Sequence, residues 1–315
     1  MTDAEFLKDV ELGLSSNPRS LPSKYLYDDT GSALFQEIMK MPEYYPTDCE
    51  MEILSAKQMD FNKYFQNGKP LEFVELGAGD GFKVVSFLKF FNKNGTDFSY
   101  KPIDISSKAL ETLEHRVASE LPGIKIETYQ DDYFLALEKL SRQNHSHRIY
   151  LFLGGNIGNF SKNQALEFLI NMRASILKDD LVIVGFDLKK DPRVIINAYD
   201  DPHGITAKFN LNMLRRINRE LDANFDLDAF QFYPYYYPET GEVKSYLYSL
   251  KDQEVYIDKA RLHVPFKKWD YIHTEISKKF DLKEIEELAK QTGFRLVQHV
   301  FDEKQYFSDS IFRAV

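Results

Sequence analysis

A glycine-rich turn after a short apolar run is the segment of this chain best suited to chemistry. Residues 71–83 read LEFVELGAGDGFK, and three glycines follow the apolar run directly: Gly77, Gly79 and Gly81. Glycine has no Cβ, so the backbone can take positive φ and expose its N–H groups to a ligand. We therefore expect a buried strand at 71–76, a helix at 82–92 and a nucleotide-type site between them.

Glu75 lies at the end of the apolar run and narrows the choice of nucleotide. The dinucleotide fingerprint is Gly-x-Gly-x-x-Gly, whereas the spacing here is Gly-x-Gly-x-Gly. A carboxylate beside the turn disfavours a pyrophosphate, which is itself anionic. The pattern suits a ligand that has no phosphate and carries a cationic centre, as S-adenosylmethionine does. A dehydrogenase and a glycine turn without a ligand remain alternatives at this point.

Acidic residues also end the next two predicted strands. Asp104 follows the run YKPI, a position from which a carboxylate accepts hydrogen bonds from both hydroxyls of a ribose. Asp132 follows the third strand, where an acid can bind the exocyclic amine of adenine while Tyr133 lies along the ring. Each aspartate fits a helix N-cap equally well. Together with Glu75, however, they place acids at three successive strand ends and favour a bound adenosine.

A second glycine-rich loop follows the fourth predicted strand. Residues 153–160 read LGGNIGNF and include Gly154 and Asn159. The carboxyl ends of parallel strands share one edge of a sheet, so this loop is expected at the same crevice as Gly77. A structural turn would explain the glycines. It explains Asn159 less readily, because an asparagine side chain both donates and accepts hydrogen bonds.

Strand and helix patterns alternate between residues 61 and 190. We expect strands at 71–76, 98–104, 124–130, 148–153 and 181–187. We expect helices at 82–92, 107–120, 132–142 and 162–177, the last of them opened by a capping box of Ser161 and Gln164. This alternation predicts an α/β fold with a doubly wound, mostly parallel sheet.

The flanking segments have other patterns. Residues 1–60 look helical, and Thr47 with Glu50 fits a capping box that would start a helix at Thr47. Residues 193–222 are also helical in pattern. Residues 228–275 are β-like and rich in tyrosines, which would form either a strand face or a cage for an ammonium group.

The last residues return to the sheet. Asp281 is expected to cap a helix that Gly293 ends, and two final strands follow at 294–301 and 308–315. The short connection between these strands predicts an antiparallel hairpin. A mostly parallel, Rossmann-like sheet finished by such a hairpin is typical of S-adenosylmethionine-dependent methyltransferases and unusual in dehydrogenases.

Two domains are therefore expected. Residues 61–192 and 280–315 form the predicted methyltransferase domain, which binds S-adenosylmethionine. Residues 1–60 and 193–279 form a second, α+β subdomain, which binds the substrate.

Composition limits the classes of partner. The 315 residues carry a formal net charge of −9, which disfavours nucleic acid and anionic membranes, and Cys49 is the single cysteine. The chain shows neither a signal-peptide pattern nor an apolar run long enough for a membrane span. His145 and His147 form a polar pair without a cysteine partner, so no metal site is expected. We expect a cytoplasmic monomer that acts on a small molecule.

Seven segments give the chain a more specific resemblance: 21–28 (LPSKYLYD), 42–47 (PEYYPT), 75–77 (ELG), 152–159 (FLGGNIGN), 198–201 (AYDD), 225–230 (FDLDAF) and 274–280 (TEISKKF). Through them, nearly the whole chain resembles the histidine-specific S-adenosylmethionine methyltransferases. These enzymes trimethylate the α-amino group of L-histidine on the route to ergothioneine. The resemblance implies the same reaction here, up to the trimethylated betaine.

Site residues follow from the resemblance by position. It places the cofactor on Gly77, Lys83, Asp104, Asp132 and Tyr133, with Tyr27 nearby, and the residues themselves add Glu75 and Gly79. It implies that Asn159 and Tyr199 hold the substrate carboxylate, that Glu275 and Ser277 bind the imidazole, and that Phe35, Tyr44 and Gly154 line the amine. Tyr44, Asn159 and Tyr199 are the expected catalytic residues, with Tyr44 or a water beside it assisting loss of the amine proton.

The chain departs from the family pattern at one point. The family often has a methionine facing the imidazole in the strand before the Glu-x-Ser motif, and residues 242–247 (EVKSYL) contain none. Two alternatives therefore stay open. One is a methyltransferase of the same fold that acts on another aromatic amino acid or its derivative. The other is a non-catalytic protein that binds an amino acid or nucleoside.

Overall fold

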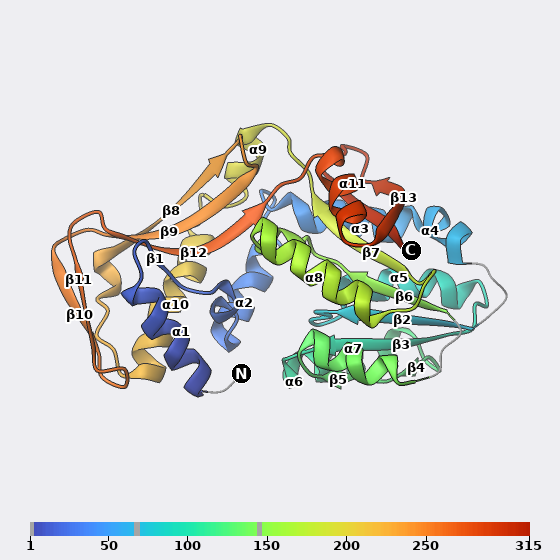
Figure 1. Cartoon of the computed structure of the whole chain (residues 1–315), viewed down its shortest axis with the longest axis horizontal. Coiled ribbons are helices and arrows are strands. Elements are labelled where there is room, and N and C mark those ends of the chain that lie inside the picture. The colour runs from blue at the N-terminus through green and yellow to red at the C-terminus, as the bar shows by residue number, and fades with distance from the viewer. Residues whose placement is uncertain (1–2, 66–69, 144–146) are drawn as a thin grey trace. The chain divides into compact units, whose positions relative to one another are not determined.

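The computed structural model of the protein describes residues 3–65, 70–143 and 147–315. Contacts divide the chain into two units, each made of two separate stretches. Unit 1 comprises Met1–Tyr45 and Lys190–Lys278, and unit 2 comprises Pro46–Lys189 and Lys279–Val315 (Figure 1). His145 lies outside the described residues.

Unit 2 is built on a mostly parallel sheet with the strand order β13-β14-β7-β6-β2-β3-β4, and β5 also pairs with β3. The neighbouring strands β7, β6, β2 and β3 run parallel to one another, which confirms the predicted fold class. The predicted strand at 124–130 is divided into two short strands. The bounds are β2 Leu71–Leu76, β3 Phe98–Asp104, β4 Lys125–Ile126, β5 Tyr129–Gln130, β6 Arg148–Phe152, β7 Leu181–Asp187, β13 Phe294–Phe301 and β14 Phe307–Ala314.

Helices cover both faces of this sheet. Val74 of β2 belongs to an apolar cluster with Leu137 of α7, Phe168 of α8 and residues of α11. Phe73, the preceding residue, points to the other face, where its ring packs on the rings of Phe65, Phe87 and Phe91 at 5.3–5.9 Å. The helix bounds are α3 Tyr45–Ala56, α4 Gln58–Phe65, α5 Phe82–Lys93, α6 Ser107–Glu120, α7 Tyr133–Ser141, η2 Asn156–Asn159, α8 Lys162–Ser175 and α11 Leu282–Gln291.

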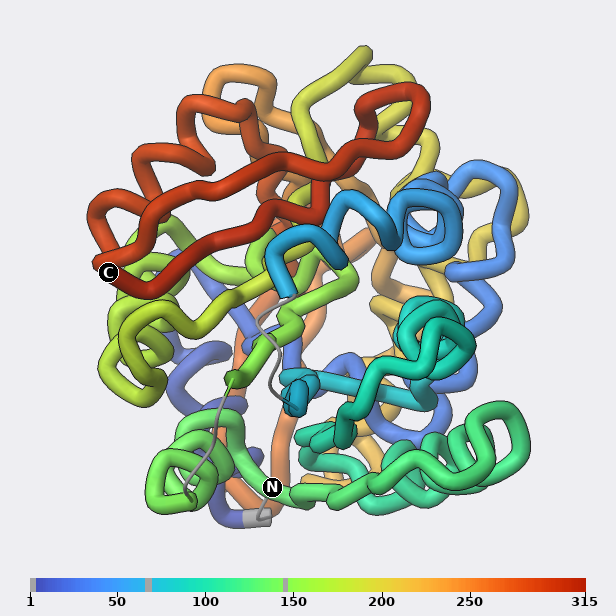
Figure 2. The backbone as a smooth tube through the Cα atoms, turned by 90° about the vertical axis from the view of Figure 1, so that its right-hand side faces the viewer, coloured from blue at the N-terminus to red at the C-terminus, as the bar shows by residue number. Residues whose placement is uncertain are grey.

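The C-terminal hairpin forms as predicted. β14 runs antiparallel to both β7 and β13, and Figure 2 shows β13 and β14 (red) side by side. Asp281 and Glu284 form a reciprocal capping box at the start of α11, and Gly293 follows its end with φ of 80°. Ser161 and Gln164 form the predicted capping box at α8, and Asp281 forms the predicted cap of α11. The sequence can show these caps because the residues that form each cap lie within four consecutive positions.

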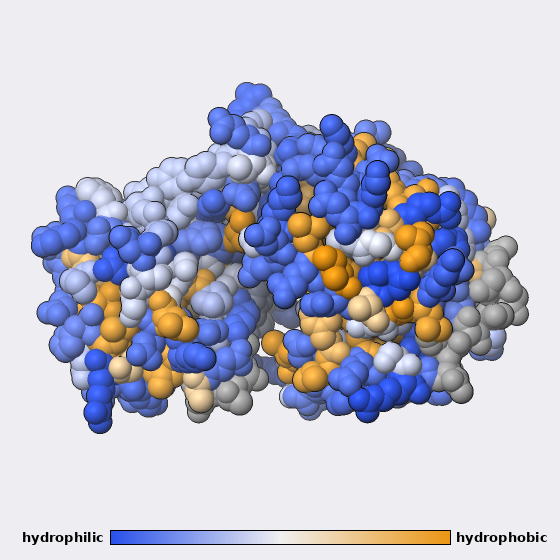
Figure 3. Space-filling model, viewed as in Figure 1, coloured by the Kyte–Doolittle hydropathy of each residue, from blue (hydrophilic) through white to orange (hydrophobic). Residues whose placement is uncertain are grey.

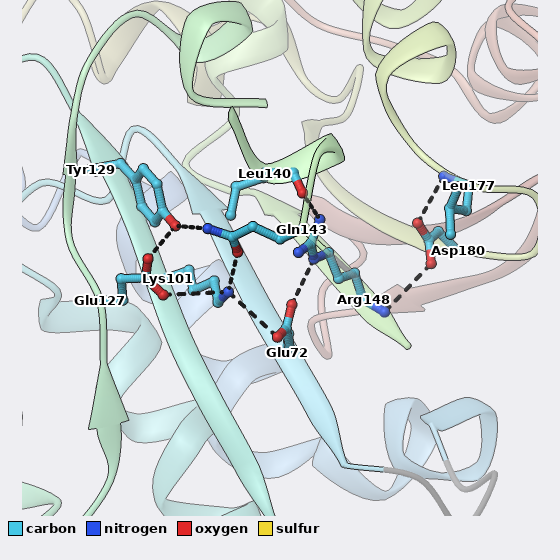
Figure 4. A network of polar contacts seen from close by, with 9 residues as sticks. All are labelled: Glu72, Lys101, Glu127, Tyr129, Leu140, Gln143, Arg148, Leu177 and Asp180. Atoms are coloured by element: carbon cyan, nitrogen blue, oxygen red, sulfur yellow. Dashed lines mark hydrogen bonds and ion pairs between the residues drawn. The ribbon is translucent and has the colours of Figure 1, made fainter. Parts of the chain in front are cut away.

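A polar network joins three strands of unit 2 (Figure 4). Arg148 is fully buried, and its Nε donates to Glu72 at 2.6 Å while Nη1 donates to the carbonyl of Leu140 at 2.7 Å. Lys101 donates to Gln143 at 2.9 Å and lies 3.4 Å from Glu72. The strands are therefore joined by ion pairs as well as by backbone hydrogen bonds.

Unit 1 contains a four-stranded sheet in the order β1-β12-β9-β8 and a separate β10-β11 hairpin. Its core includes Phe209 and Leu214 of α10 together with Leu247 and Ile272 of the sheet. The bounds are α1 Asp3–Ser15, β1 Arg19–Ser20, η1 Ser23–Leu26, α2 Asp29–Ile38, α9 Pro192–Asn197, α10 Ile205–Leu221, η3 Leu227–Ala229, β8 Phe230–Tyr237, β9 Glu242–Ser249, β10 Gln253–Ile257, β11 Leu262–Phe266 and β12 Tyr271–Lys278.

Tyrosines cover one face of the four-stranded sheet. The ring of Tyr246 packs edge to face on Tyr271 at 5.1 Å and on Tyr235 at 5.9 Å. Over β8 and β9 the space-filling view shows a pale surface of intermediate hydropathy (Figure 3). The aromatic run is therefore a strand face whose rings contact one another.

Two boundary predictions differ from the structure. The first boundary between units follows Tyr45 rather than residue 60, because α3 and α4 pack in unit 2. The other boundaries lie within three residues of 192/193 and 279/280. The capping box at Thr47 is wrong, since α3 already begins at Tyr45 and Glu50 contacts residues far away in sequence. None of the described helices is long and apolar enough to cross a membrane.

Candidate active site

The glycine turn of unit 2 has the conformation that its sequence predicts. Gly77, Gly79 and Gly81 have φ values of 71°, 56° and 71°, where L-residues with side chains are strained. Asp104 holds this turn, because its Oδ2 accepts a hydrogen bond from the Gly79 N–H at 2.9 Å. Its Oδ1 accepts from the N–H of Ser106, also at 2.9 Å. A carboxylate has further lone pairs, so Asp104 remains able to accept from a ribose.

The turn leaves room for a ligand beside its backbone. A Cβ built on Gly79 would meet no atom within 4 Å, whereas one on Gly77 would lie 2.7 Å from the Tyr133 hydroxyl. Tyr133 therefore lies directly against the turn, and its ring packs edge to face on Phe152 at 6.1 Å. Burial and the charges of Asp104 and Asp132 raise the pKa of Tyr133 well above its usual value, so it acts as a neutral hydroxyl.

Glu75 and Asp132 have structural contacts of their own. Glu75 is buried and accepts a hydrogen bond from the hydroxyl of Tyr100. Burial raises the pKa of Glu75 to about 8, and the bond from Tyr100 acts in the opposite direction. Asp132 is the N-cap of α7 and accepts from the Phe134 N–H at 2.9 Å. Its carboxylate is exposed, and Tyr133 is the next residue in the chain.

Lys83 and Gly154 meet at the carboxyl ends of β2 and β6. A Cβ on Gly154 would lie 3.1 Å from Lys83 Nζ and 3.3 Å from Asn156 Nδ2. The Gly154 N–H donates to Glu50 Oε1 at 2.6 Å, and Glu50 Oε2 forms an ion pair with Lys83. The sequence analysis did not predict that Glu50 belongs to this site, because its spacing from Thr47 fits a local helix cap. Asn159 is half-buried at the end of η2.

Unit 1 joins Tyr199, expected to hold the substrate carboxylate, to Ser277, expected to bind the imidazole. The Tyr199 hydroxyl donates to Ser277 Oγ at 2.8 Å. Glu275 lies two residues before Ser277 on β12, after a β-bulge between His273 and Glu275. Beyond the bulge, Glu275 pairs with Ser245 and Ser277 pairs with Val243, both of which face the interior of the unit. The bulge therefore turns the two side chains to the face opposite the tyrosines.

Three predicted residues form an aromatic group with Phe209 of α10. The ring of Phe35 lies 5.4 Å from Tyr27, 6.1 Å from Tyr44 and 5.9 Å from Phe209. All four belong to unit 1. Tyr27, expected near the cofactor, is more than one-third exposed and packs on Phe35 and Phe209. An aromatic wall of this kind accepts a cationic amine by cation–π contact.

A family model matches nearly the whole chain. A family model described as histidine-specific methyltransferase, SAM-dependent, matches residues 6–314. Histidine N-alpha-methyltransferase of Mycobacterium tuberculosis is 33% identical over 96% of this chain and 93% of its own length. The protein of the same name from Mycolicibacterium smegmatis is also 33% identical, over 91% of this chain and 88% of its own length.

A solved structure supports the fold. Mitomycin 7-O-methyltransferase MmcR matches with a TM-score of 0.50 at 12% identity, covering 99% of this chain and 67% of that protein. The likeness covers the fold of the chain, which includes a mostly parallel sheet finished by an antiparallel hairpin. Among the described residues, no group of three His, Cys, Asp or Glu side chains is arranged to hold a metal ion.

Proposed function

The chain belongs to the histidine-specific, S-adenosylmethionine-dependent methyltransferase family, and from that membership we propose that it methylates the α-amino group of L-histidine. S-adenosylmethionine supplies an activated methyl group on a sulfonium. The chain itself contributes binding, orientation and the exclusion of water. These effects are worth up to about 7–11 kcal/mol when the reacting atoms are well aligned.

The observation that carries the choice of histidine is the arrangement of Glu275, Ser277 and Tyr199. An imidazole has two nitrogens, one a donor and one an acceptor. A carboxylate and a hydroxyl two residues apart on one strand face match these groups. The 2.8 Å bond from Tyr199 holds the Ser277 hydroxyl on the same strand as Glu275, where the two groups can serve the two nitrogens of the ring.

The remaining roles follow the family pattern and are proposals for each residue. Asn159 binds the substrate carboxylate, and Tyr199 joins it when its single hydroxyl proton turns from Ser277 to the substrate. Gly154 lines the amine together with Phe35 and Tyr44. An ammonium group has no lone pair, so the substrate must lose a proton before each methyl transfer. Tyr44, or a water beside it, assists that loss. The aromatic wall that includes Phe35 tolerates an amine that becomes permanently cationic after the third transfer.

The residues around the glycine turn fit S-adenosylmethionine. The open space at Gly79 admits a ligand, and Asp104 holds the turn with lone pairs left for a ribose. Tyr27, Glu75, Gly77, Lys83, Asp132 and Tyr133 complete the proposed set. Tyr133 would contact the adenine, and the Lys83 ammonium would face the carboxylate of the ligand.

The test is mass spectrometry of a panel of amino acids incubated with the enzyme and a labelled methyl donor. We expect mono-, di- and trimethylated histidine. Glu275→Ala should lower kcat/KM for histidine by about 100-fold, the loss expected when a hydrogen bond to a charged group is removed. Glu254→Ala, which removes an exposed glutamate of the same unit, should leave it unchanged.

The alternatives give different results in the same assay. A methyltransferase for another aromatic amino acid would methylate that substrate and keep its activity in Glu275→Ala. A binding protein without activity would bind the cofactor and yield no methylated product. Either result would rule out the proposed reaction.

We further propose a cytoplasmic enzyme that acts as a monomer and without nucleic acid or membrane partners. The net charge of −9 supports this setting, since nucleic acids and anionic lipids attract basic surfaces. Light scattering after size exclusion tests the monomer, whose mass should be close to the 36.8 kDa of the chain.

A further inference from the structure

Glu50 of α3 is a buried carboxylate for which the proposed function has no role. Its side chain is 1% exposed, and each of its oxygens has a separate partner. Oε1 accepts a hydrogen bond from the Gly154 N–H at 2.6 Å, and Oε2 is paired with the ammonium of Lys83. One side chain thus joins the helix that follows β2 to the loop that follows β6.

The sheet makes room for this carboxylate. A Cβ built on Gly185, in the middle of β7, would lie 2.7 Å from Glu50 Oε1 and 3.1 Å from the ring of Phe307. Any other residue at 185 would therefore displace Glu50. The other residues of β7 before Asp187 are apolar and have side chains, so a glycine at 185 indicates that the position of the carboxylate matters.

Asp309 of β14 supports the charge of Glu50. Asp309 is fully buried, and its carboxyl group lies within hydrogen-bonding reach of the carboxyl group of Glu50. Burial and the charge of Glu50 raise the pKa of Asp309 well above its usual value, which favours the protonated form of Asp309. A protonated Asp309 can donate to Glu50. The group then holds a single negative charge, which is balanced by Lys83.

We propose that Glu50 is a positioning residue for the amino-acid end of S-adenosylmethionine, acting by fixing the Lys83 ammonium and the Gly154 N–H. The inference rests on the proposed function only for the identity of the cofactor. The Lys83 side chain is 23% exposed, whereas that of Glu50 is 1% exposed. Lys83 can therefore contact a ligand carboxylate from solvent while its buried partner Glu50 fixes the position of its ammonium. A lysine held in place loses less side-chain entropy when the ligand binds.

The test compares two ligands by isothermal titration calorimetry. S-adenosylhomocysteine has the amino-acid end, and 5′-methylthioadenosine lacks it. Glu50→Gln should weaken binding of S-adenosylhomocysteine by about 10- to 100-fold, the range for a charge-assisted hydrogen bond. Binding of 5′-methylthioadenosine should change by less than about twofold, because its contacts do not include Lys83. Glu111→Gln, an exposed glutamate of α6, is the matched control and should change neither.

A double-mutant cycle tests whether Glu50 acts through Lys83. In a Lys83→Gln background, Glu50→Gln should have little further effect on S-adenosylhomocysteine. An equal loss with and without Lys83 would overturn the proposal. An equal weakening of both ligands, or unchanged binding of S-adenosylhomocysteine, would overturn it as well.

Two further variants cover the case in which Glu50→Gln does not fold. Gly185→Ala adds one methyl group against Glu50 and should reproduce the selective loss. Asp309→Asn keeps a neutral donor and should bind both ligands as the wild type does. These titrations contain no free L-histidine, so a wrong assignment of the amino-acid substrate would leave their outcome unchanged.

Discussion

Glu75 keeps its proton at neutral pH because it is buried at the end of β2 and has a pKa of about 8. An unfolded glutamate titrates near pH 4.5. Between these values the folded protein holds a proton that the unfolded chain has lost, so the free energy of unfolding falls as pH rises. This contribution is complete below pH 4.5 and is fully lost above about pH 8.

Replacing Glu75 by glutamine should remove this pH dependence. Glutamine is neutral, has nearly the same shape, and can accept the hydrogen bond from Tyr100. Between pH 5 and 8, the free energy of unfolding of the wild type should fall by about 1 kcal/mol per pH unit relative to Glu75→Gln. Urea unfolding of both proteins over this range measures the difference.

Histidines do not obscure this comparison. Burial lowers the pKa of His273 and His299, so these residues reduce stability as pH falls below about 6.5. They are present in both proteins, and their effect cancels in the difference. Parallel curves for wild type and Glu75→Gln would show that Glu75 is ionised in the folded state.

Removing the hydroxyl of Tyr199 should lower kcat/KM for the amino-acid substrate and leave cofactor binding unchanged. Tyr199→Phe breaks the 2.8 Å bond to Ser277 and keeps the ring. We expect kcat/KM for histidine to fall about 10-fold, which corresponds to one hydrogen bond. The Kd of S-adenosylhomocysteine should stay the same. Tyr256→Phe in the β10 strand is the control; weaker cofactor binding with unchanged histidine kinetics would contradict the assignment.

Secondary-structure elements depend on a few side chains that satisfy backbone groups in turns. Asp302 joins β13 to β14 and is 2% exposed. Its Oδ1 accepts from the N–H groups of Tyr306 and Phe307 at 2.8 and 2.7 Å, and its Oδ2 accepts from Lys304 at 3.0 Å. One carboxylate thus serves three donors of the terminal hairpin.

Asp302→Ala should therefore destabilise the protein by about 2–4 kcal/mol, since it leaves partly buried N–H groups without acceptors. Asp302→Asn keeps one acceptor oxygen and should lose about half as much. Chemical denaturation measures both values. Equal stability of the alanine variant and the wild type would mean that water replaces the carboxylate at this turn.

Local patterns predicted the elements whose signals are complete in a few residues. The turn after β2 follows from an apolar run and glycines, and the capping box at Ser161 follows from side chains three residues apart. The cap at Asp281 follows from an acidic residue just before a helical pattern. Glu50 has the same spacing from Thr47, yet its partners are Lys83 and Gly154. Contacts over 33 and 104 residues leave no periodic signal.

The bulge of β12 is a second feature that the sequence could not show. A strand read by simple alternation would place Glu275 on the same face as His273. The extra residue reverses this and turns Glu275 to the interior side with Ser245. The candidate site could therefore be predicted by residue type and resemblance, whereas the orientation of its side chains depends on pairing between strands.

In the whole molecule, the connectivity of the chain links the unfolding of the two units. The two stretches of unit 1 are separated in sequence by residues 46–189, all of which belong to unit 2. If unit 2 unfolded alone, those residues would become a flexible loop that unit 1 must close. Closing such a loop costs roughly 4 kcal/mol, a large share of the stability of a typical domain. We therefore expect the two units to unfold together.

A change confined to unit 2 should then appear in a probe of unit 1. Trp269 is the single tryptophan and belongs to unit 1. Arg148→Met removes the buried arginine of the polar network in unit 2 and leaves Glu72 with a weaker partner, which should cost roughly 3 kcal/mol. The unfolding midpoint from Trp269 fluorescence should fall as far as the midpoint from far-UV circular dichroism.

Arg142→Met, whose arginine forms an exposed pair with Glu138, is the control and should shift neither midpoint. A fall in the circular dichroism midpoint with Trp269 unchanged would show that the units unfold independently, and that the entropy of the connecting chain is too small to couple them.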